Sequence, residues 1–453
     1  MSLRQPILDH ADEEVLEALR AHLRPLTGKA NDYDDLLNLA ESAQFVLLGE
    51  ASHGTYEFYR ERAEITKRLI LERQCRAVAV EGDWPDAWRV NRFVRGLAGD
   101  ADARSALSGF RRFPSWMWRN TVVLDFVEWL RNHNRGLPPL QRVGFYGLDL
   151  YSMFTSIAQI LAHLDRTDPE AARRARARYE CFDHADGDSQ AYGYGASFGL
   201  SRQCEDEVVQ QLHEMNRLLT ESPKQPGPQR DEAFFARQNA LLVKNAEEYY
   251  RTMFRGRVSS WNLRDSHMAQ TLQALASHLA QECGDGKPRI AVWAHNSHLG
   301  DARATEMGRQ GEWNLGQLLR ERAGTDALLV GFSTYSGTVT AASDWDEPHR
   351  CMRVRPGLPG SWEQMFHQTG EPRFLMTLRG NDSLRSVTTA GRLQRAIGVI
   401  YRPETERSSH YFYTRLADQF DAIVHIDQTS ALEPLDPTEV TGSAEPETFP
   451  SGI

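Results

Sequence analysis

The sequence lacks several features that would have placed it in a particular class of protein. It has no surplus of positive charge: its net charge of −10 argues against nucleic acid or an anionic membrane as a partner. It has no apolar run long enough to span a membrane. Residues 1–23 are acidic and amphipathic, unlike a secretory signal peptide. We therefore expect a soluble, cytoplasmic protein whose partner is a small-molecule substrate, and we predict no particular oligomeric state.

Cysteine is also scarce. The chain has five cysteines and no C-x-x-C pair, and the positions are Cys75, Cys181, Cys204, Cys283 and Cys351. An odd, dispersed set is typical of reduced thiols rather than of a disulfide framework or a zinc site. An H-E-x-x-H sequence, the strongest zinc signature, is absent as well.

Four short apolar runs share one pattern, in which each run ends in polar residues. The runs are QFVLLGE, RAVAVEGD, RVGFYGLD and RIAVWAHN, which carry Glu50, Glu81, Asp149 and His295. Apolar runs that alternate with helices are typical of parallel strands buried on both faces. Open α/β sheets place their ligands beyond the carboxyl ends of such strands. We therefore predict that one sheet brings these four side chains to a common rim.

The same pattern predicts an α/β fold with a central mixed, largely parallel sheet flanked by helices. Residues 1–150 would form the first part of the α/β core, and residues 284–435 the second part. Residues 151–283 are predicted to be a large helical insertion or lid. Residues 436–453, rich in Pro, Thr and Glu, would be a flexible tail.

Smaller features refine this prediction. A polar linker at 222–230 interrupts the helical insertion. Further strand candidates follow residue 300, namely ALLVGFSTYSGTVTAA, RFLMTL, AIGVIY and FDAIVHID. A turn centred on Gly337 suggests a hairpin within the first of them, which would make the sheet mixed.

The stretch LLGEASHGTYEFYRER, residues 47–62, contains the first candidate for chemistry. Glu50 and His53 lie in the predicted turn between a strand and a helix. A carboxylate bound to an imidazole fixes the tautomer of the ring and raises its basicity, which suits a general base. A single E-x-x-H pair is a weak signal, so a solvated helix start is the competing interpretation.

The second candidate is VWAHNSHLGD, in which His295 and His298 follow another strand. They could be acid–base or electrophilic groups that act on a substrate. They could instead ligate a divalent cation together with His53 and either Glu50 or Asp149. The structural alternative is a pair of histidines in a polar loop.

Two acidic residues follow the strand RAVAVEGD. Asp83 is a candidate helix N-cap, with a proline in the first turn after it. Glu81 would be costly to bury without a partner, and Arg62 is the partner that we predict for it.

One sequence match suggests a serine nucleophile, but we do not expect it to be one. Residues 195–199, GASFG, match G-x-S-x-G and would make Ser197 the nucleophile. That mechanism needs a strand before the turn, and the preceding DHADGDSQAYGYG is no strand. Nearby aromatic residues are candidates for lining a wide apolar site, with ordinary core packing as the alternative; they are Trp84, Trp116, Tyr192 and Phe198.

Five blocks in order resemble the erythromycin esterase family over about residues 30–435. They are LLGEASHGTYEFYRERAEITKRLI, AVAVEGDWPDAWRVNRFVRG, NLRDSHMAQTL, VWAHNSHLGD and YRPETERSSHYFYTRLADQFDAIVHID. The resemblance covers the broad branch of homologues at least as well as the resistance esterases. It implies hydrolysis of a carboxylic ester, a macrolide lactone in the named antibiotic-resistance members, by activated water and without a cofactor.

The resemblance also implies roles for residues. His53 matches the general base and Glu50 the carboxylate beside it. Arg62 and Glu81 match supporting charged residues. His295 matches the second essential histidine, with His298 as the nearby alternative.

Our leading hypothesis is therefore a hydrolase in which Glu50 orients His53 to activate water. His295, aided by Arg62 or Arg264, would stabilise the oxyanion or protonate the leaving group. Two alternatives are a hydrolase that uses a divalent metal in the same cleft and a non-catalytic protein that binds a hydrophobic ligand there.

Overall fold

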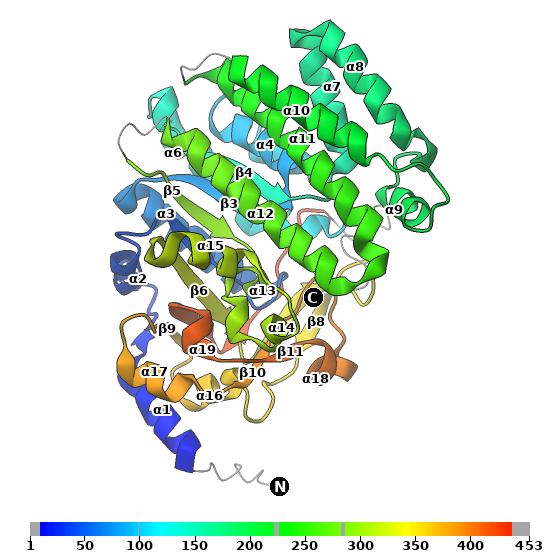
Figure 1. Cartoon of the computed structure of the whole chain (residues 1–453). Coiled ribbons are helices and arrows are strands. Elements are labelled where there is room, and N and C mark those ends of the chain that lie inside the picture. Colours follow the sequence, from blue (N-terminus) through cyan, green and yellow to red (C-terminus); the bar gives the residue numbers. More distant parts are fainter. Residues whose placement is uncertain (1–9, 98, 222–225, 282–285, 437–453) are drawn as a thin grey trace.

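The computed structural model describes residues 10–97, 99–221, 226–281 and 286–436, and its centre is an eight-stranded sheet (Figure 1). The strand order is β1-β9-β12-β6-β2-β5-β3-β4. The strands are β1 (Arg24–Pro25), β2 (Phe45–Leu48), β3 (Cys75–Asp83), β4 (Gly144–Asp149), β5 (Arg289–Trp293), β6 (Ala327–Ser333), β9 (Arg373–Thr377) and β12 (Ala422–Ile426). All pairs from β12 to β4 are parallel, whereas β9 runs antiparallel to β12 and β1. The prediction of a mixed, largely parallel sheet is confirmed.

The four apolar runs of the sequence become β2, β3, β4 and β5. They lie side by side because β2 pairs with β5, β5 with β3 and β3 with β4. The register sets Leu48 opposite Trp293. Because these strands are parallel, their carboxyl ends meet at one edge of the sheet, as predicted.

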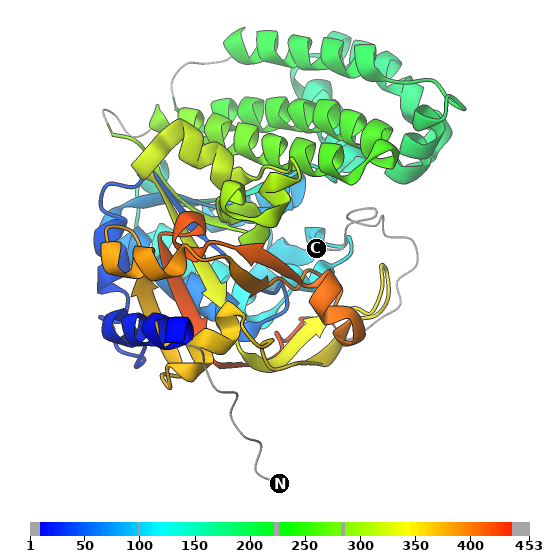
Figure 2. The same cartoon turned by 60° about the horizontal axis from the view of Figure 1, so that its bottom comes forward.

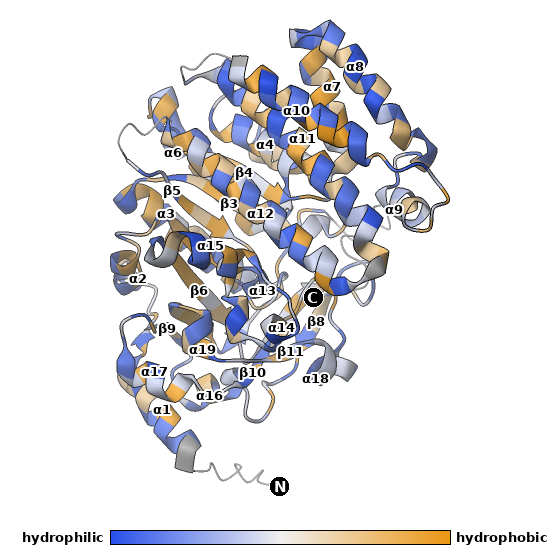
Figure 3. Ribbon diagram, in the orientation of Figure 1, coloured by the Kyte–Doolittle hydropathy of each residue, from blue (hydrophilic) through white to orange (hydrophobic). Residues whose placement is uncertain are grey.

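Helices cover both faces of the sheet, and alternate residues of each strand pack on opposite sides. Phe45 and Leu47 of β2 belong to one apolar cluster, and Val46 and Leu48 belong to the other. Figure 3 shows the apolar strands between amphipathic helices. Helices that contribute to the second cluster include α2 (Asp34–Leu39), α3 (Tyr56–Arg73), α4 (Trp84–Val94) and α6 (Thr121–Arg135). The first cluster includes residues of α1 (His10–His22), α15 (Leu315–Ala323) and α16 (Trp362–Gln368).

The segment between β4 and β5 folds as a layer of helices on one side of the molecule (Figure 2). Its main helices are α7 (Met153–Thr167), α8 (Pro169–Tyr179), α9 (Ser189–Ser197), α10 (Glu205–Glu221), α11 (Pro228–Thr252) and α12 (Arg257–Ala280). The helix α12 packs beside edge strand β4, so the helical layer contacts the main sheet. Within the described residues, no helix is long and apolar enough to cross a bilayer.

The expectation that every cysteine is a reduced thiol is wrong for one pair. Cys181 and Cys204 form a disulfide in the helical layer, with their Cα atoms 5.7 Å apart. Cys75 and Cys351 are free thiols. Cys283, part of the predicted linker (222–225) and most of the predicted tail (437–453) lie outside the described residues.

The hairpin predicted around Gly337 is also wrong. β6 belongs to the main sheet, whereas β7 (Ser336–Ala341) forms a separate sheet with β8 (Arg350–Val354) and β13 (Gln428–Thr429). Gly337 has φ +142°, and a Cβ there would lie 2.0 Å from the carbonyl oxygen of Thr429. The run AIGVIY makes only isolated bridges, at Ile397 and Ile400, and β10 (Arg392–Arg395) pairs with β11 (Tyr411–Thr414). Antiparallel pairing in the main sheet comes from β9 instead.

The turn after β2 is held between these outer segments by backbone contacts. Its residues 51–53 bond to Ile397, with the amide of Ile397 donating to the carbonyl of Ala51 (2.8 Å). The carbonyl of Gly54 accepts from the amides of Thr340 and Leu432, each at 2.9 Å. A Cβ at position 54 would lie 1.8 Å from the carbonyl oxygen of Thr340.

We predict that Gly54→Ala lowers the free energy of unfolding by at least about 2 kcal/mol, because backbone must move to admit the methyl group. Chemical denaturation would measure the loss. Gly136→Ala is the matched control, since a Cβ there meets no atom within 4 Å. Equal stability of the two variants would contradict the tight contact at position 54.

Candidate active site

Glu50 and His53 are buried together in the turn after β2. Nδ1 of His53 lies 2.9 Å from Oε1 of Glu50. Arg62 belongs to α3 and is fully buried. It donates from Nη2 to Oε2 of the same carboxylate at 2.8 Å. Because an ionised carboxylate can only accept, the hydrogen shared with His53 resides on Nδ1. The lone pair of the ring therefore lies on Nε2, as a general base requires.

His295 lies next to this pair although 242 positions separate the two histidines in the chain. The ring centroids of His53 and His295 are 4.9 Å apart. The backbone N–H of Ser297 donates to Nδ1 of His295 (3.2 Å), and the Ser297 hydroxyl lies 2.8 Å from the same atom. Since Nδ1 accepts from the backbone, the ring hydrogen of neutral His295 resides on Nε2. That nitrogen is buried, and among the described residues the carbonyl of Ala51 is the neighbour that favours protonation of the ring.

Glu81 and Asp149, at the ends of β3 and β4, share one cation from α12. Arg264 binds Asp149 through Nε (3.0 Å) and Nη2 (2.6 Å), and Nη2 also donates to Glu81 at 2.8 Å. The second oxygen of Glu81 accepts the backbone N–H of His295 at 2.8 Å. The predicted pairing of Glu81 with Arg62 is therefore wrong: Arg264 supplies this charge, and Arg62 serves Glu50.

His298 completes the charged network from the far side of Glu81. Its Nδ1 lies 2.9 Å from Asp265, and its Nε2 lies 3.3 Å from Glu81 and 3.1 Å from Arg264. The ring stacks on Trp261 with centroids 4.5 Å apart. Sequence reasoning missed Asp265, Trp261 and Ser297 as parts of the site. The signal for Asp265 was its place beside Arg264 in the block NLRDSHMAQTL.

Burial and neighbouring charge give the two histidines of this loop opposite character. Burial, and then the charge of His53, lower the pKa of His295 well below its usual range, so this ring stays neutral. Burial opposes the charge of His298 too, but Asp265 and Glu81 outweigh it and raise the pKa of His298 to about 10. Burial alone would raise the pKa of Glu81, but His298 and Arg264 hold that pKa well below its ordinary value.

The histidines do not form a set of metal ligands. In the described part of the chain, no three His, Cys, Asp or Glu side chains are grouped so that they could hold a metal ion. His298 is committed to Asp265 and Glu81, and Arg264 places a positive charge between Glu81 and Asp149. The geometry therefore does not fit the ligand set of His53, His295, His298 and a carboxylate.

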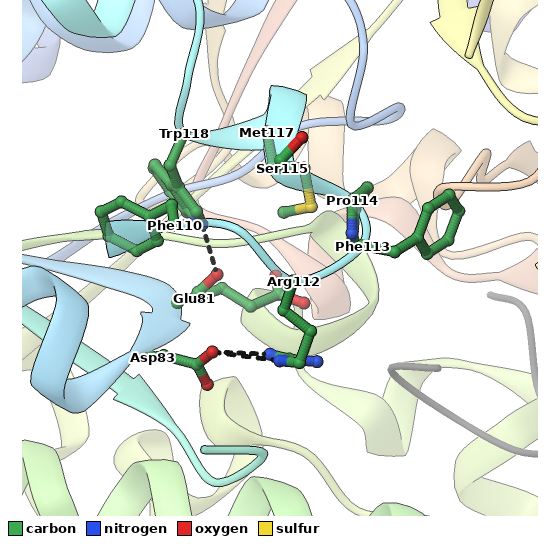
Figure 4. A pocket seen from close by; sticks show the side chains of 10 residues that line it. Glu81, Asp83, Phe110, Arg112, Phe113, Pro114, Ser115, Met117 and Trp118 are labelled. Carbon is green, nitrogen blue, oxygen red and sulfur yellow. Dashed lines mark hydrogen bonds and ion pairs between the residues drawn. The ribbon is translucent and has the colours of Figure 1, made fainter. Parts of the chain in front are cut away.

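Asp83 precedes α4, where the sequence places the N-cap, but its side chain makes no capping hydrogen bond. It accepts instead from Arg112 at 2.9 Å, at the edge of a small pocket (Figure 4). The pocket has a volume of about 20 Å³, and Glu81 is part of its lining. Trp118 closes it by donating from Nε1 to the carbonyl of Glu81 at 3.1 Å.

The aromatic residues suggested as a ligand surface lie in different environments. Trp84 is buried and stacks with Trp88 at 6.2 Å. Trp116 is buried in the same apolar cluster as Val46 and Leu48 of β2. Tyr192 donates its hydroxyl to Glu247 inside the helical layer, whereas Phe198 is 59% exposed on the surface.

The structure around Ser197 differs from that of a G-x-S-x-G nucleophile. Ser197 is the last residue of helix α9, and its hydroxyl donates to the carbonyl of Arg251 at 2.7 Å. No strand of the described chain precedes it within the helical layer. This environment lacks the strand-to-helix turn on which a G-x-S-x-G nucleophile is exposed.

A larger cavity adjoins the histidines. Its volume is about 170 Å³, and Ser297 and Trp261, which contact His295 and His298, form part of its lining. Ala396 and residues 408–412 also line it. The site therefore borders a space with both aromatic and hydroxyl-bearing walls.

Known proteins share this fold. The fold is similar to a crystal structure of a succinoglycan biosynthesis protein (TM-score 0.74, 19% identity, covering 96% of this chain and all of the other). It is also similar to a protein from Bacillus cereus (0.74, 20%, covering 93% and 99%). A mutant of erythromycin esterase EreC in its open conformation matches as well (0.66, 18%, covering 90% and 96%).

The similarity to these solved structures establishes a shared fold. Membership of a family is established by a family model. The model described as erythromycin esterase matches residues 70–429, which include Glu81, Arg264, His295 and His298. Membership of this family supports a hydrolase. The chain belongs to the erythromycin esterase family.

Proposed function

We propose that this protein hydrolyses a carboxylic ester, a macrolide lactone or a related ester, with a water molecule activated by His53. The observation that carries this proposal is the buried Glu50–His53 pair, whose imidazole lies 4.9 Å from that of His295. One ring is oriented as a base, and the other is held neutral with its hydrogen on the opposite nitrogen. Ester hydrolysis needs this combination of a proton acceptor and a hydrogen-bond donor.

The reaction follows from the protonation states. Nε2 of His53 removes a proton from water while Glu50 accepts the hydrogen bond of Nδ1–H and stabilises the imidazolium that forms. The resulting hydroxide attacks the ester carbonyl carbon and gives a tetrahedral oxyanion. When the C–O bond breaks, His53 returns the proton to the leaving alkoxide, so that acid and alcohol are released and the base is restored.

His295 is the donor that the geometry favours for the oxyanion. Ser297 fixes its Nδ1 as an acceptor, so the ring hydrogen lies on Nε2. In this proposal that N–H turns from the Ala51 carbonyl to the negatively charged oxygen of the intermediate. Neutral donors of this kind are effective because they are preorganised in a site without bulk water. The low pKa keeps the ring uncharged in the physiological range.

Arg62 and Arg264 have supporting roles in this proposal. Arg62 lies 4.3 Å from the ring centroid of Tyr59 and 5.3 Å from that of Trp293, behind Glu50. Arg264 is bound by Glu81 and Asp149. In this proposal both hold carboxylates in place, and His295 takes the role of oxyanion donor.

We predict that His53→Gln lowers kcat at least about a thousandfold, because the general base is lost while the fold remains. Hydrolysis of a panel of chromogenic esters and lactones would measure it, and mass spectrometry after incubation with erythromycin would detect the gain of one water. His213→Gln, at an exposed position of α10, is the control. Near-native activity of His53→Gln would refute the mechanism, and ligand binding without any turnover by the wild type would favour a binding protein.

We predict that Ser197→Ala retains full activity, because this hydroxyl bonds to a helix carbonyl and has no catalytic task. The same ester panel and a circular dichroism spectrum would test this. A thousandfold loss of kcat with an unchanged fold would restore the serine mechanism.

We predict that His298 makes stability fall as pH rises. The folded protein holds this proton up to a pKa of about 10, so the stabilisation is complete below about pH 6.5, the ordinary value, and is lost as pH rises towards 10. Over that pH window the free energy of unfolding of the wild type should fall by up to about 1.4 kcal/mol per pH unit more than that of His298→Asn. Urea denaturation at several pH values would show it, with His213→Asn as control; equal slopes for wild type and His298→Asn would contradict a charged His298.

A further inference from the structure

A third cavity lies at the opposite end of the sheet from the histidines of the candidate active site. It is formed by the end of α4, the last turns of α6 and the residues before β4, where that strand begins rather than ends. Its volume is about 190 Å³, and its lining consists of Val94, Arg95, Gly96, Arg131, Asn134, Arg135 and Arg142. The cavity is therefore separate from the site described above, and its lining contains arginine but no acidic residue.

Most arginines of the described chain are paired with carboxylates, but those of this cavity are largely not. Arg95 is the exception, since Nη1 donates to Asp231 at 2.9 Å. Among the described residues, Arg131, Arg135 and Arg142 have no carboxylate partner. In a protein with a net charge of −10, three such neighbouring cations form an isolated positive site.

Gly96 brings two of these charges together. A Cβ at this position would lie 2.7 Å from Nη1 of Arg131 and 3.2 Å from Nη1 of Arg142. The two guanidinium groups therefore lie against the same short piece of backbone. Burial and the charges of Arg135 and Arg142 lower the pKa of Arg131. Like charges placed this way repel each other, and an anion between them would relieve the repulsion.

Neutralisation of helix ends explains only part of this cluster. Arg142 donates to the carbonyls of Arg95 (2.6 Å) and Leu137 (3.2 Å), which are typical contacts at a helix C-terminus. Arg135 lies in the last turn of α6, where a positive charge is favourable. Arg131 lies a turn earlier, and its guanidinium is 5.2 Å from the ring of Phe93, with no hydrogen bond to any described residue.

We propose that this cavity binds the phosphate group of a small metabolite, either inorganic phosphate or a phosphorylated compound. Guanidinium groups present paired N–H donors that match the oxygens of phosphate, and charge-assisted hydrogen bonds of this type are strong. Arg131 and Arg135 supply the uncommitted donors, and Arg142 adds charge from a fixed position. Gly96, which has no side chain, leaves room for the guanidinium groups of Arg131 and Arg142.

Isothermal titration calorimetry at low ionic strength tests this proposal with inorganic phosphate, pyrophosphate and ATP as probes. We expect wild type to bind at least one probe, and Arg131→Gln and Arg135→Gln each to weaken binding about tenfold or more. Arg322→Gln is the matched control, because this exposed arginine of α15 carries the same charge outside the cavity. It should change affinity less than about twofold.

Thermal unfolding provides a second readout that does not depend on ester hydrolysis. In phosphate-free buffer Arg131→Gln should unfold at or above the wild-type Tm, since a repelling charge is removed, and should lose the rise in Tm that the bound probe gives wild type. Tightest binding of inorganic phosphate would identify free phosphate as the ligand, and tightest binding of ATP a phosphorylated metabolite. Absence of binding to wild type, or equal weakening by Arg322→Gln and Arg131→Gln, would overturn the proposal.

Discussion

The requirement that every buried charge have a partner determines how this molecule is built around the carboxyl ends of its parallel strands. Glu50, Glu81 and Asp149 stand at the ends of three strands with almost no exposure to water. Unpaired carboxylates there would be prohibitively costly, so two buried arginines are fixed against them. Because those arginines come from α3 and α12, the requirement also fixes how helices on either side dock against the sheet.

The convergence of the site could be predicted from the sequence because it follows from local pattern. Apolar runs that end in Glu50, Glu81, Asp149 and His295 define parallel strands, and parallel strands place their carboxyl ends together. The three-residue spacing of Glu50 and His53 also suffices to bring their side chains into contact across one turn. No long-range information was needed for either inference beyond the existence of one sheet.

Other features depend on contacts between distant segments, which a single sequence does not encode in any local pattern. Arg62 and Arg264 are both arginines near acidic residues, and only the docking of α12 decides which one reaches Glu81. Gly337 looked like a hairpin turn, but it lies in a strand that pairs with Thr429, far along the chain. The spacing of Cys181 and Cys204 carried no signal of pairing, since the helices of the layer bring them together.

The origin of Arg264 has a consequence for how the helical layer can vary. This arginine sits on α12, within the segment inserted between β4 and β5, yet it is the counter-ion of two carboxylates on the core sheet. A graft of a shorter or unrelated cap onto the same core would strand those two anions in an apolar interior. Natural or engineered exchange of the layer is thus restricted to replacements that deliver a guanidinium to the same point, whatever else they alter above it.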